Sequence, residues 1–492
     1  MHASIIRVSA ASGAAVALSI IGVSGASAAG TPTQTSGRAP AAAAPHAAAG
    51  PGTQAWVQRY NGTKAGADHA NSVAVSPSGG AVYVTGESHA VGAISTVYDY
   101  ATVAYDAATG ARLWVQRYNG PVNGDDRARS IAVSPAGGTV YVTGQSDGGT
   151  ATSSDYATVA YDAATGAQLW VQRYNGPGSG SDGASSVSVS PTGNMVYVTG
   201  ESFGDYATVA YDAATGAQLW VMRYDGPGHS TDAANSIAAS PNGKAVYVTG
   251  FSYGTNTSDD YATIAYNAAT GAQLWIKRYD SPGHVDDEAW SLAVSPSGET
   301  VFVTGNSHRT SHSGTDYTTV AYNGATGAQR WVKRYSGPYG GYNYANSMAV
   351  SPTGATVYVT GQSHAAGNAS NSDYATVAYD ATTGAQLWAQ RYNGPGNDID
   401  GGTSVAVSHA GGTVYVTGES FGGTASWYDY ATVAYDAGTG AQLWVKRYTG
   451  PGSATDQANS VAVSPTENKV FVTGYGAGAT TGDDYTTIGY NG

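Results

Sequence analysis

The sequence contains no cysteine and little charge. None of its 492 residues is Cys, and only 11% are Asp, Glu, Lys or Arg. Without thiols the chain can form neither disulfides nor thiolate metal sites, and it has no cysteine nucleophile. The 34 acidic residues outnumber the 21 Lys and Arg, which gives a formal charge of −13. We therefore expect no nucleic-acid partner, because neutralising phosphates requires clustered Lys and Arg.

Long hydrophobic runs are also missing. The longest near the N-terminus, Ala14 to Val23, is about ten residues, whereas a membrane-spanning helix needs about 20. It precedes Ala26-Ser27-Ala28, and together they are typical of a signal peptide, which we predict over residues 1–28. Residues 29–54 are rich in Ala, Pro, Thr and Gly and predict a flexible linker. We therefore expect a secreted, extracellular monomer without a membrane span.

Glycine and tyrosine, by contrast, are abundant, with 68 and 37 copies, and from residue 55 onward they lie in a repeat. Four short segments recur in the same order, as in SVSVSPTGNMVYVTGESFGDYATVAYDAATGAQLWVMRY from Ser186 to Tyr224. The fourth segment contains one Trp in each of eight copies: Trp56, Trp114, Trp170, Trp220, Trp275, Trp331, Trp388 and Trp444. Eight copies between residues 55 and 492 give a period of about 55 residues, which fits a four-stranded unit.

Each of the four segments has the alternation of a β-strand. Apolar residues alternate in SVAVS, VYVTG, YATVAY and LWVQRY, and turns such as S-P-x-G and D-A-A-T-G separate the segments. Four antiparallel strands repeated eight times predict an all-β fold, an eight-bladed β-propeller over residues 55–492. This region begins with a lone fourth segment and ends with a lone third one. We therefore predict that the N-terminal strand closes the ring, whereas the alternative, a linear solenoid, would carry capping repeats.

The segment AYDAATGAQLW, for example Ala160 to Trp170, resembles the A-x-D-x-x-T-G-x-x-x-W tryptophan-docking motif of the quinoprotein alcohol dehydrogenase-like, or PQQ-like, eight-bladed propellers. The whole unit also resembles bacterial secreted β-propeller repeats with DYATVAYD and YVTG segments, over essentially all of residues 55–492. The resemblance implies that each of the eight Trp residues docks one blade onto its neighbour. A large ring with one N–H donor suits such a structural position.

The same resemblance raises the question of a quinone cofactor, which the residues disfavour. Dehydrogenases of that family place a disulfide between adjacent cysteines against the cofactor, and this chain has no Cys. Few cations are expected on the face that would hold an acidic cofactor: Lys64, Arg127, Arg129 and Arg309. We therefore predict no cofactor and disfavour a PQQ-dependent dehydrogenase.

An Asp precedes the first strand in most copies of the repeat. Its members are Asp68, Asp126, Asp182, Asp232, Asp287, Asp400 and Asp456, with Asn343 in the remaining copy. Such a ring of carboxylates could bind cations, and its oxygen ligands would suit calcium. An Asp beside a turn can also accept backbone N–H bonds. We favour the structural interpretation, because a self-consistent fold repeats its local rules.

Departures from the repeat are where we look for function, because a single site is used once. The connection between the second and third segments varies from four to twelve residues. In a propeller it shares a face with the connection to the next blade, and variable loops on a rigid scaffold commonly carry function. Seven His fall in these connections: His69, His89, His229, His284, His308, His312 and His364. None has the spacing of metal ligands, so we predict no metal site from them.

One sector departs most from the repeat, in the segments HVDDEAW (284–290) and PYGGYNY (338–344) and the loop between them. Its candidate binding residues are His284, Asp287, Glu288, Trp290, His308, Arg309, His312, Tyr339, Tyr342 and Tyr344. Exposed aromatics with acids between them suit sugar stacking or a peptide anchor. Alternatively, these rings pack beneath a local loop. A second, smaller departure is Ser426-Trp427-Tyr428.

These features favour a secreted scaffold whose variable face binds an extracellular carbohydrate or protein without catalysis. The alternative is a polysaccharide-active lyase or hydrolase, for which acids and bases are available at His284, Asp286, Asp287, Glu288 and His308. A third interpretation is a stable wall or matrix component. No Ser/His/Asp set or nucleophile elbow is visible, so the sequence assigns no catalytic residue.

Overall fold

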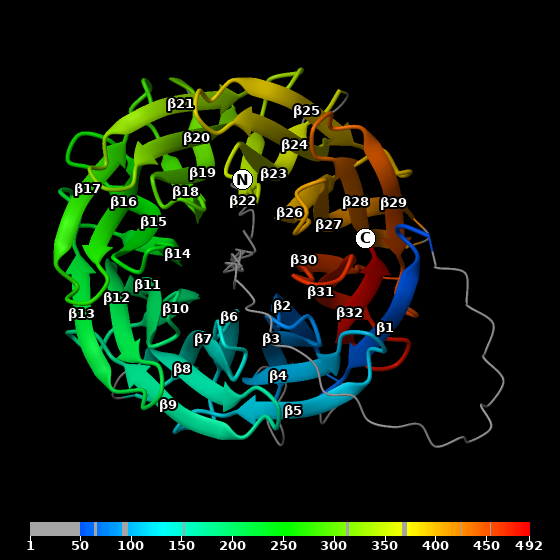
Figure 1. Cartoon of the computed structure of the whole chain (residues 1–492), viewed down its shortest axis with the longest axis horizontal. Helices are drawn as coiled ribbons and strands as arrows, with labels where there is room; N and C mark the ends of the chain where they lie inside the picture. Colours follow the sequence, from blue (N-terminus) through cyan, green and yellow to red (C-terminus); the bar gives the residue numbers. More distant parts are fainter. Residues whose placement is uncertain are drawn as a thin grey trace, which may run out of the picture.

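Eight four-stranded antiparallel sheets stand around a central axis and form a closed ring (Figure 1). The computed structural model describes residues 50–62, 66–90, 97–150, 153–310, 314–366, 371–424, 426–452 and 454–492. The predicted signal peptide and residues 29–49 of the predicted linker lie outside these ranges. The eight sheets confirm the predicted eight-bladed β-propeller. Among the described residues, no helix is long and apolar enough to cross a membrane.

The two inner strands of each blade come from the first and second repeated segments. The innermost strands are β2 (Asp68–Val75), β6 (Asp126–Val133), β10 (Asp182–Val189), β14 (Asp232–Ala239), β18 (Asp287–Val294), β22 (Asn343–Val350), β26 (Asp400–Val407) and β30 (Gln457–Val463). The second strands are β3 (Ala81–His89), β7 (Thr139–Asp147), β11 (Met195–Ser202), β15 (Ala245–Tyr253), β19 (Thr300–His308), β23 (Thr356–His364), β27 (Thr413–Gly423) and β31 (Lys469–Ala477).

The two outer strands come from the third and fourth segments. The third strands are β4 (Tyr98–Asp106), β8 (Ser154–Asp162), β12 (Asp205–Asp212), β16 (Asp259–Asn267), β20 (Thr315–Asn323), β24 (Ser372–Asp380), β28 (Trp427–Asp436) and β32 (Asp483–Asn491). The outermost strands are β5 (Arg112–Tyr118), β9 (Gln168–Tyr174), β13 (Gln218–Tyr224), β17 (Gln273–Tyr279), β21 (Gln329–Tyr335), β25 (Gln386–Tyr392), β29 (Gln442–Tyr448) and β1 (Gln54–Tyr60). We number the blades 1 to 8 along the chain, from β2–β5 to the blade of β30, β31, β32 and β1.

The hydrophobic core lies between blades rather than within one. Tyr100 and Trp114 of blade 1 pack with Ile131, Val140 and Val142 of blade 2 in one buried cluster. Eight such clusters follow one another around the ring. Because both faces of each sheet are covered by neighbours, the third strands are apolar or small along almost their whole length.

A circuit of buried tyrosine hydroxyls also joins the blades. The hydroxyl of Tyr100 in β4 donates to the carbonyl of Ala157 in β8 at 3.1 Å. The same bond recurs in every other blade, from Tyr156, Tyr206, Tyr261, Tyr317, Tyr374, Tyr430 and Tyr485. The last of them returns to Ala101 in blade 1. One tyrosine hydrogen bond per blade therefore fixes the position of each third strand relative to the third strand of the next blade.

The eight repeated Trp residues also lie between blades. Nε1 of Trp56 donates to the carbonyl of Ala107 in the next blade at 3.1 Å. The same bond to the next blade is made by Trp114, Trp170, Trp220, Trp275, Trp331 and Trp388. Trp444 packs its ring 6.0 Å from that of Tyr490. The facing turn needs glycine, because Gly110 has a φ of +73° and a Cβ there would lie 2.7 Å from the Trp56 ring. This is the docking geometry that the resemblance implies.

The N-terminal strand closes the ring, as predicted. β1 pairs with β32, so that blade 8 has the strand order β1-β32-β31-β30. Trp56 lies opposite Gly489 and Tyr60 opposite Tyr485 in this pairing. Arg59 of β1 also forms an ion pair with Asp484 of β32 at 3.0 Å. Segments from the two ends of the repeat domain therefore share one sheet.

Candidate binding face

The connections of the blades lie on two faces of the ring. The turns from first to second and from third to fourth strand form one face, the turn face. The other connections form the variable face, because in an antiparallel blade they lie at the opposite end of the strands. The turn face is nearly uniform: Oδ1 of Asp106 accepts the N–H of Thr109 at 2.8 Å, and this bond recurs at Asp162, Asp212, Asp380 and Asp436.

The repeated Asp or Asn lies at the variable-face end of each innermost strand, as its first residue in seven blades and directly before it, at Asp456, in blade 8. Oδ2 of Asp68 accepts the N–H of Gly62 at 2.7 Å, and Oδ1 accepts the N–H of His89 at 3.0 Å. The bond to the incoming connection recurs at Asp126, Asp182, Asp232, Asp287, Asp400 and Asp456. The bond from Oδ1 to the end of the second strand recurs at Asp232, Asp400 and Asp456. In these blades and in blade 1 the carboxylate ties the two connections of the variable face together, which is the structural role that we favoured.

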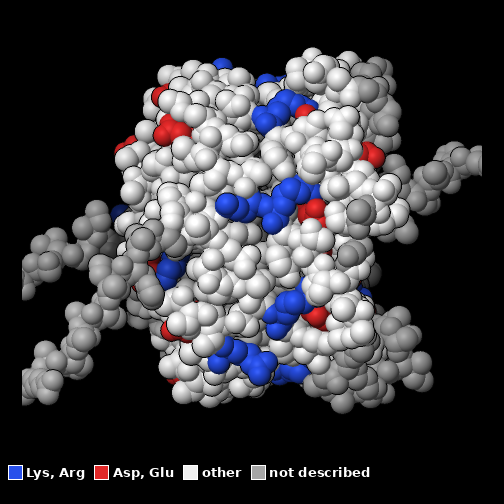
Figure 2. All heavy atoms as spheres, turned by 90° about the vertical axis from the view of Figure 1, so that its right-hand side faces the viewer, with Lys and Arg blue, Asp and Glu red and all other residues white. Residues whose placement is uncertain are grey.

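An Arg–Asp ion pair supports this face in every blade. In blade 1, Arg117 of β5 lies 2.8 Å from Asp99 of β4 and donates to the hydroxyl of Ser88 at 2.5 Å. The other pairs are Arg59–Asp484, Arg173–Asp155, Arg223–Asp205, Arg278–Asp260, Arg334–Asp316, Arg391–Asp373 and Arg447–Asp429. On the side shown in Figure 2, basic side chains form separate groups with acidic atoms beside several of them. These charges therefore join strands rather than form one basic surface there.

The position three residues after the Gly of the T-G pair, at or near the end of the second strand, carries different side chains around the ring, and we call these residues the variable ring. In chain order they are His89, Asp147, Phe203, Tyr253, His308, His364, Phe421 and Ala477. In four blades the backbone at this position is held by the repeated Asp: the N–H groups of His89, Tyr253, Phe421 and Ala477 donate to its Oδ1, at 3.1 Å for Tyr253. Phe203 packs over Gly180, where a Cβ would come within 1.9 Å of its ring. A constant scaffold thus presents varied side chains on one face.

Exposed aromatic side chains gather on the variable face. Among the described residues, the large exposed aromatics are Phe203, Tyr253, Tyr339, Tyr342 and Trp427, which are 42% to 62% exposed. All five lie in or beside connections of the variable face. The large exposed aliphatic residues are leucines of the outermost strands, such as Leu219. Rings that could stack on a ligand are therefore confined to one face of the described structure.

The variable face also holds the strained backbone. Seven non-glycine residues of the described chain have positive φ: Ser153, Ser179, Phe203, His229, His284, Asn397 and Trp427. All belong to connections of this face. The left-handed region is unfavourable for a bulky residue such as Phe203, with a φ of 47°, or Trp427, with 56°. Strain of this kind is typical of functional surfaces, where selection is not for stability alone.

The predicted sector contains acids and a histidine at the entry to β18. Nδ1 of His284 lies 2.5 Å from Oδ2 of Asp280, and the histidine side chain is 66% exposed. Asp287 is fully buried and accepts the N–H of Ser281 at 2.6 Å. Glu288 is half-buried in β18. Of the three predicted residues here, only His284 is open to a large ligand.

The loop after β19 holds two more predicted residues. Nε of Arg309 donates to Oδ1 of Asp316 at 2.8 Å, so its charge is used within the protein. His308 is half-buried at the end of β19 and belongs to the variable ring. His312 lies outside the described residues. In this loop, the charge of Arg309 is therefore neutralised by Asp316, and His308 is only partly accessible to a ligand.

Trp290 lies at a β-bulge in β18, between Ala289 and Ser291, and is half-buried. At the equivalent bulge, an Asn side chain donates to a carbonyl of the next blade at 2.8 Å in four blades: Asn71, Asn235, Asn346 and Asn459. Trp290 thus replaces the residue of a repeated contact between blades. It is not the exposed aromatic that the sequence predicts at this position.

Three predicted tyrosines lie together where the chain enters β22. The rings of Tyr342 and Tyr344 stack with centroids 6.3 Å apart and planes 7° from parallel. The ring of Tyr339 lies 5.9 Å from the guanidinium carbon of Arg391, within the range of a cation–π contact. Tyr339 and Tyr342 are exposed, whereas Tyr344 is half-buried. This part of the predicted sector presents aromatic surface.

Asp287 is the predicted residue best suited to acid–base chemistry by its pKa. Burial raises the pKa of Asp287 to about 7, although hydrogen bonds from Ser307 and Ser281 oppose the rise. Burial also raises the pKa of the equivalent Asp126, Asp400 and Asp456 to about 6. The raised pKa therefore follows from a repeated buried position and does not mark a unique catalytic group.

Sequence reasoning missed three aromatic members of the variable ring, Phe203, Tyr253 and Phe421. The signal was present, because the residue after T-G-x-S changes between copies that otherwise match closely. Because this position varies once in every blade, it does not stand out when the departures are grouped by sector. Sequence reasoning also missed Asp280, whose carboxylate binds His284. The signal for it is that most other copies have Asn at this position.

The fold and this face define a PQQ-like eight-bladed propeller, in which repeated contacts build the ring and one face varies. A family model described as outer membrane protein assembly factor BamB matches residues 42–206, 204–373 and 368–487. The chain therefore belongs to this family. No curated protein sequence matches it.

Solved propellers share the fold at low sequence identity. The chain is similar to Sqt1 from Chaetomium thermophilum, with 12% identity and a TM-score of 0.58 over 90% of this chain and 99% of that chain. It is also similar to Sqt1 of that organism bound to the N-terminus of the ribosomal protein L10, with 13% identity and a TM-score of 0.57 over 88% and 98%. It is similar as well to the quinohemoprotein alcohol dehydrogenase from Comamonas testosteroni, with 16% identity and a TM-score of 0.52 over 89% of this chain and 76% of that chain. These likenesses concern the fold alone.

The described residues do not fit a quinone cofactor. An acidic cofactor needs available cations, but Arg127 lies 3.0 Å from Asp125 and Arg309 is bound to Asp316. Arg129 donates to Gln145 at 3.0 Å, and Lys64 lies outside the described residues. The chain also has no cysteine for the disulfide of the dehydrogenases. The described cations of this face are thus committed to contacts within the protein.

Proposed function

We propose that the protein is a secreted, monomeric scaffold whose variable face binds an extracellular carbohydrate without catalysis. The observation that carries the proposal is the confinement of exposed aromatic side chains to that face. Aromatic rings offer flat apolar surfaces, and neighbouring acids accept hydrogen bonds from hydroxyl groups, as ligand sites commonly require. The secreted location depends on the predicted signal peptide.

The spacing of the aromatic residues favours an extended ligand. Phe203 and Tyr253 belong to neighbouring blades 3 and 4, Tyr339 and Tyr342 lie between blades 5 and 6, and Trp427 lies in blade 7. Each ring is separated from the next group by polar connections, so no single large apolar patch forms among them. A polymer that touches several such points gains avidity over a single sugar. A polysaccharide therefore fits this face better than a small molecule.

A protein partner is the second candidate, and the comparisons favour it. The family model is named for an assembly factor, and one similar propeller, Sqt1, was solved with the N-terminus of another protein bound. The chain has a formal charge of −13, which would favour a basic partner through electrostatic complementarity.

A lyase or hydrolase receives less support from the geometry. Its best candidate acid, Asp287, is fully buried and accepts the backbone N–H of Ser281, the bond that its equivalents also make to the incoming connection. His284 is exposed but is already bound to Asp280. General acid–base catalysis requires groups within reach of the substrate, which Asp287 in this arrangement is not.

The proposal is tested with the secreted chain on a panel of glycans and polysaccharides and on a peptide array, with product assays on the same samples. We expect retention on a polysaccharide without new reducing ends or unsaturated products. Release of products would favour the enzyme, and retention on peptides alone would favour the protein partner.

The binding surface is tested with Tyr339→Ala and Tyr342→Ala, alone and together. Both side chains are largely exposed, so we expect weaker binding with little change in stability. Leu274→Ala is the matched control, because Leu274 is also exposed, at 49%, but lies on the outermost strand. Equal loss of binding in the control would contradict the assignment of the face.

A further inference from the structure

An unusual cluster of carboxylates lies where blade 4 passes into blade 5. Asp260 comes from β16, Asp280 from the connection after β17, and Asp287 from the start of β18. One carboxylate oxygen from each lies within 4.8 Å of those of the other two. Oxygen ligands 2.3–2.6 Å from a calcium ion are at most about 5 Å apart, so the three could share one ion.

Oδ1 of Asp260 and Oδ1 of Asp280 lack the hydrogen bonds that burial demands. Asp260 is only 4% exposed; its Oδ2 binds Arg278, but its Oδ1 is buried and accepts no hydrogen bond. Oδ1 of Asp280 is likewise buried without a hydrogen bond, while its Oδ2 binds His284. A buried carboxylate oxygen without a donor is costly, and a bound cation would remove that penalty. Because Oδ1 is also without a hydrogen bond in Asp99, Asp373 and Asp484, the equivalents of Asp260, the oxygen that distinguishes this junction is Oδ1 of Asp280.

The surroundings add more negative charge. Asp259 lies next to Asp260 in β16, and the carboxylates of Asp286 and Glu288 lie close enough to interact with its charge. The cluster itself has three carboxylates against the single guanidinium of Arg278, a formal excess of two negative charges before His284 is counted. The local charge thus favours a divalent cation.

The next junction, from blade 5 to blade 6, shows how the protein fills the same place with its own cation. There Asp316 is the equivalent of Asp260, and Arg309 donates to its Oδ1, the oxygen that is unpartnered in Asp260. The other two acids are absent from this junction: Ser336 replaces Asp280 and Asn343 replaces Asp287. At the junction between blades 5 and 6, Arg309 occupies the place and the two other carboxylates are missing. At the junction between blades 4 and 5, all three carboxylates are kept, and no side-chain cation among the described residues donates to Oδ1 of Asp260.

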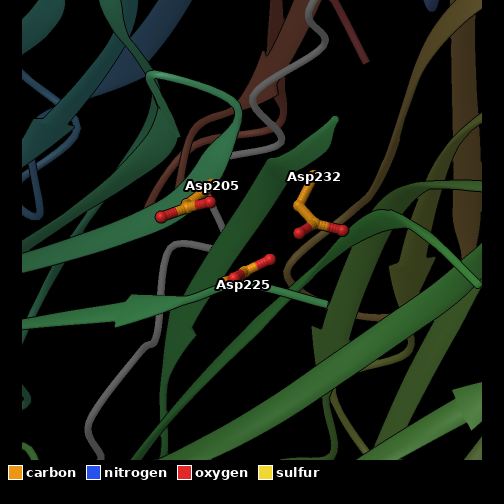
Figure 3. A group of neighbouring side chains, drawn as sticks. All are labelled: Asp205, Asp225 and Asp232. Atoms are coloured by element: carbon orange, nitrogen blue, oxygen red, sulfur yellow. The ribbon is translucent and has the colours of Figure 1, made fainter. Parts of the chain in front are cut away.

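A related cluster at the junction from blade 3 to blade 4 is less suited to a cation. Asp205, Asp225 and Asp232 gather there in the same way (Figure 3), again within 4.8 Å. However, the side chain of Asp225 is 46% exposed, and both oxygens of Asp232 already accept backbone N–H bonds, from Gly226 and Tyr253. This cluster therefore serves as a control with the same residue types.

We propose that Asp260, Asp280 and Asp287 bind a calcium ion at the junction between blades 4 and 5. Asp280 is the residue that creates the site, because four other junctions have Asn at its position: Asn61, Asn119, Asn175 and Asn393. The ion joins the third strand of one blade to the first strand of the next, beside His284 on the variable face. Calcium fits better than magnesium, because it tolerates irregular sets of oxygen ligands.

The proposal is tested by titrating the chelator-treated secreted chain with CaCl2 in a calorimeter and by measuring its Tm with and without calcium. We expect saturable binding and a rise in Tm, since a ligand that binds only the folded state stabilises it. Asp280→Asn should weaken the affinity at least tenfold and abolish the rise in Tm. Asn is the residue that the repeat itself uses there, so this variant should fold.

Asp225→Asn is the matched control, because it removes the same carboxylate from the junction between blades 3 and 4. It should leave the main binding step and the rise in Tm unchanged. The proposal is overturned by non-saturating or absent calcium binding, by wild-type behaviour of Asp280→Asn, or by loss of the main step in Asp225→Asn. Equal or tighter binding of MgCl2 would overturn the assignment to calcium.

Discussion

The turn face and the variable face of this propeller are built from the same eight repeats but differ in what they hold constant. On the turn face, side chain and backbone are both repeated, as in the Asp106–Thr109 bond and its copies. On the variable face only the backbone is repeated, because Asp68 and its equivalents fix the connections while the ring residues change. The comparison separates residues that build the ring from residues that are free to serve function.

The largest effect is expected where two blades dock. In Trp220→Ala a buried indole and its bond to the carbonyl of Ala268 are lost. Removing a buried Trp leaves a cavity, so the free energy of unfolding should fall by about 3–5 kcal/mol. Denaturant unfolding measures this. The neighbouring Leu219 is 48% exposed, and Leu219→Ala should change stability by less than about 0.5 kcal/mol; similar losses in the two variants would contradict the docking role.

A smaller effect is expected from the circuit of tyrosine hydroxyls. Tyr206→Phe keeps the ring but removes the bond to the carbonyl of Ala262, at 3.1 Å. The carbonyl keeps the hydroxyl of Thr249 as a donor, so the free energy of unfolding should fall by about 0.5–1.5 kcal/mol, the net value of one hydrogen bond. Thermal and denaturant unfolding would show it, and an unchanged midpoint would mean that the circuit does not fix the blades.

Ring closure should depend on pH through His69. Its Nδ1 lies 3.3 Å from Glu87 in the same blade, and its Nε2 lies 3.1 Å from Asp483 in blade 8. Burial lowers the pKa of His69, but the bonds to Asp483 and Glu87 outweigh it and raise the pKa from 6.5 to about 9. Since the raised value belongs to the folded state, this stabilisation is complete below pH 6.5 and is lost as the pH rises through about 9.

His69→Gln removes that titration. The wild type should therefore be more stable than the variant at pH 6, and the difference in unfolding free energy should shrink steadily toward pH 10. Unfolding midpoints at a series of pH values provide the measurement. A difference that does not change with pH would show that His69 is not held protonated between the two blades.

The smallest effect on stability, with the opposite sign, is expected on the variable face. Phe203 is 62% exposed and has a φ of 47°. Phe203→Gly relieves the strained backbone and should raise the free energy of unfolding by about 1 kcal/mol. Denaturant unfolding measures the change, with Leu219→Ala again as the exposed control. Destabilisation by more than the control would mean that the ring of Phe203 contributes to the scaffold.

The fold could be predicted because its rules repeat. Each copy gives the same alternation and the same turn residues, and the incomplete end segments predict the closure of blade 8 by β1. The Trp and Asp positions also follow from repetition, since a contact between neighbouring blades must occur once per blade. The hydrogen bonds of Asp68 and its equivalents agree with a structural role of the repeated Asp, and only at Asp287 do we propose a cation as well.

The site could be predicted only in part, because repetition says nothing about exposure. Tyr339 and Tyr342 are exposed as expected, but Trp290 and Tyr344 are half-buried and Asp287 is fully buried. The pairing of Arg309 with Asp316 joins a loop to the following strand, and no local pattern in the sequence predicts it. The missed cluster around Asp280 depends on two strands and a connection that meet only in the folded ring.

The most direct test of whether the variable face binds the ligand compares two double variants on the polysaccharide panel, each with two exposed apolar residues changed. Phe203→Gly with Tyr253→Ala changes the variable face, and Leu219→Ala with Leu274→Ala changes the outermost strands of the same two blades. If the variable face carries the function, the first variant loses retention while its Tm stays at or above that of the wild type, and the second retains wild-type binding. Loss of retention in the second variant, or full retention in the first, would contradict the account.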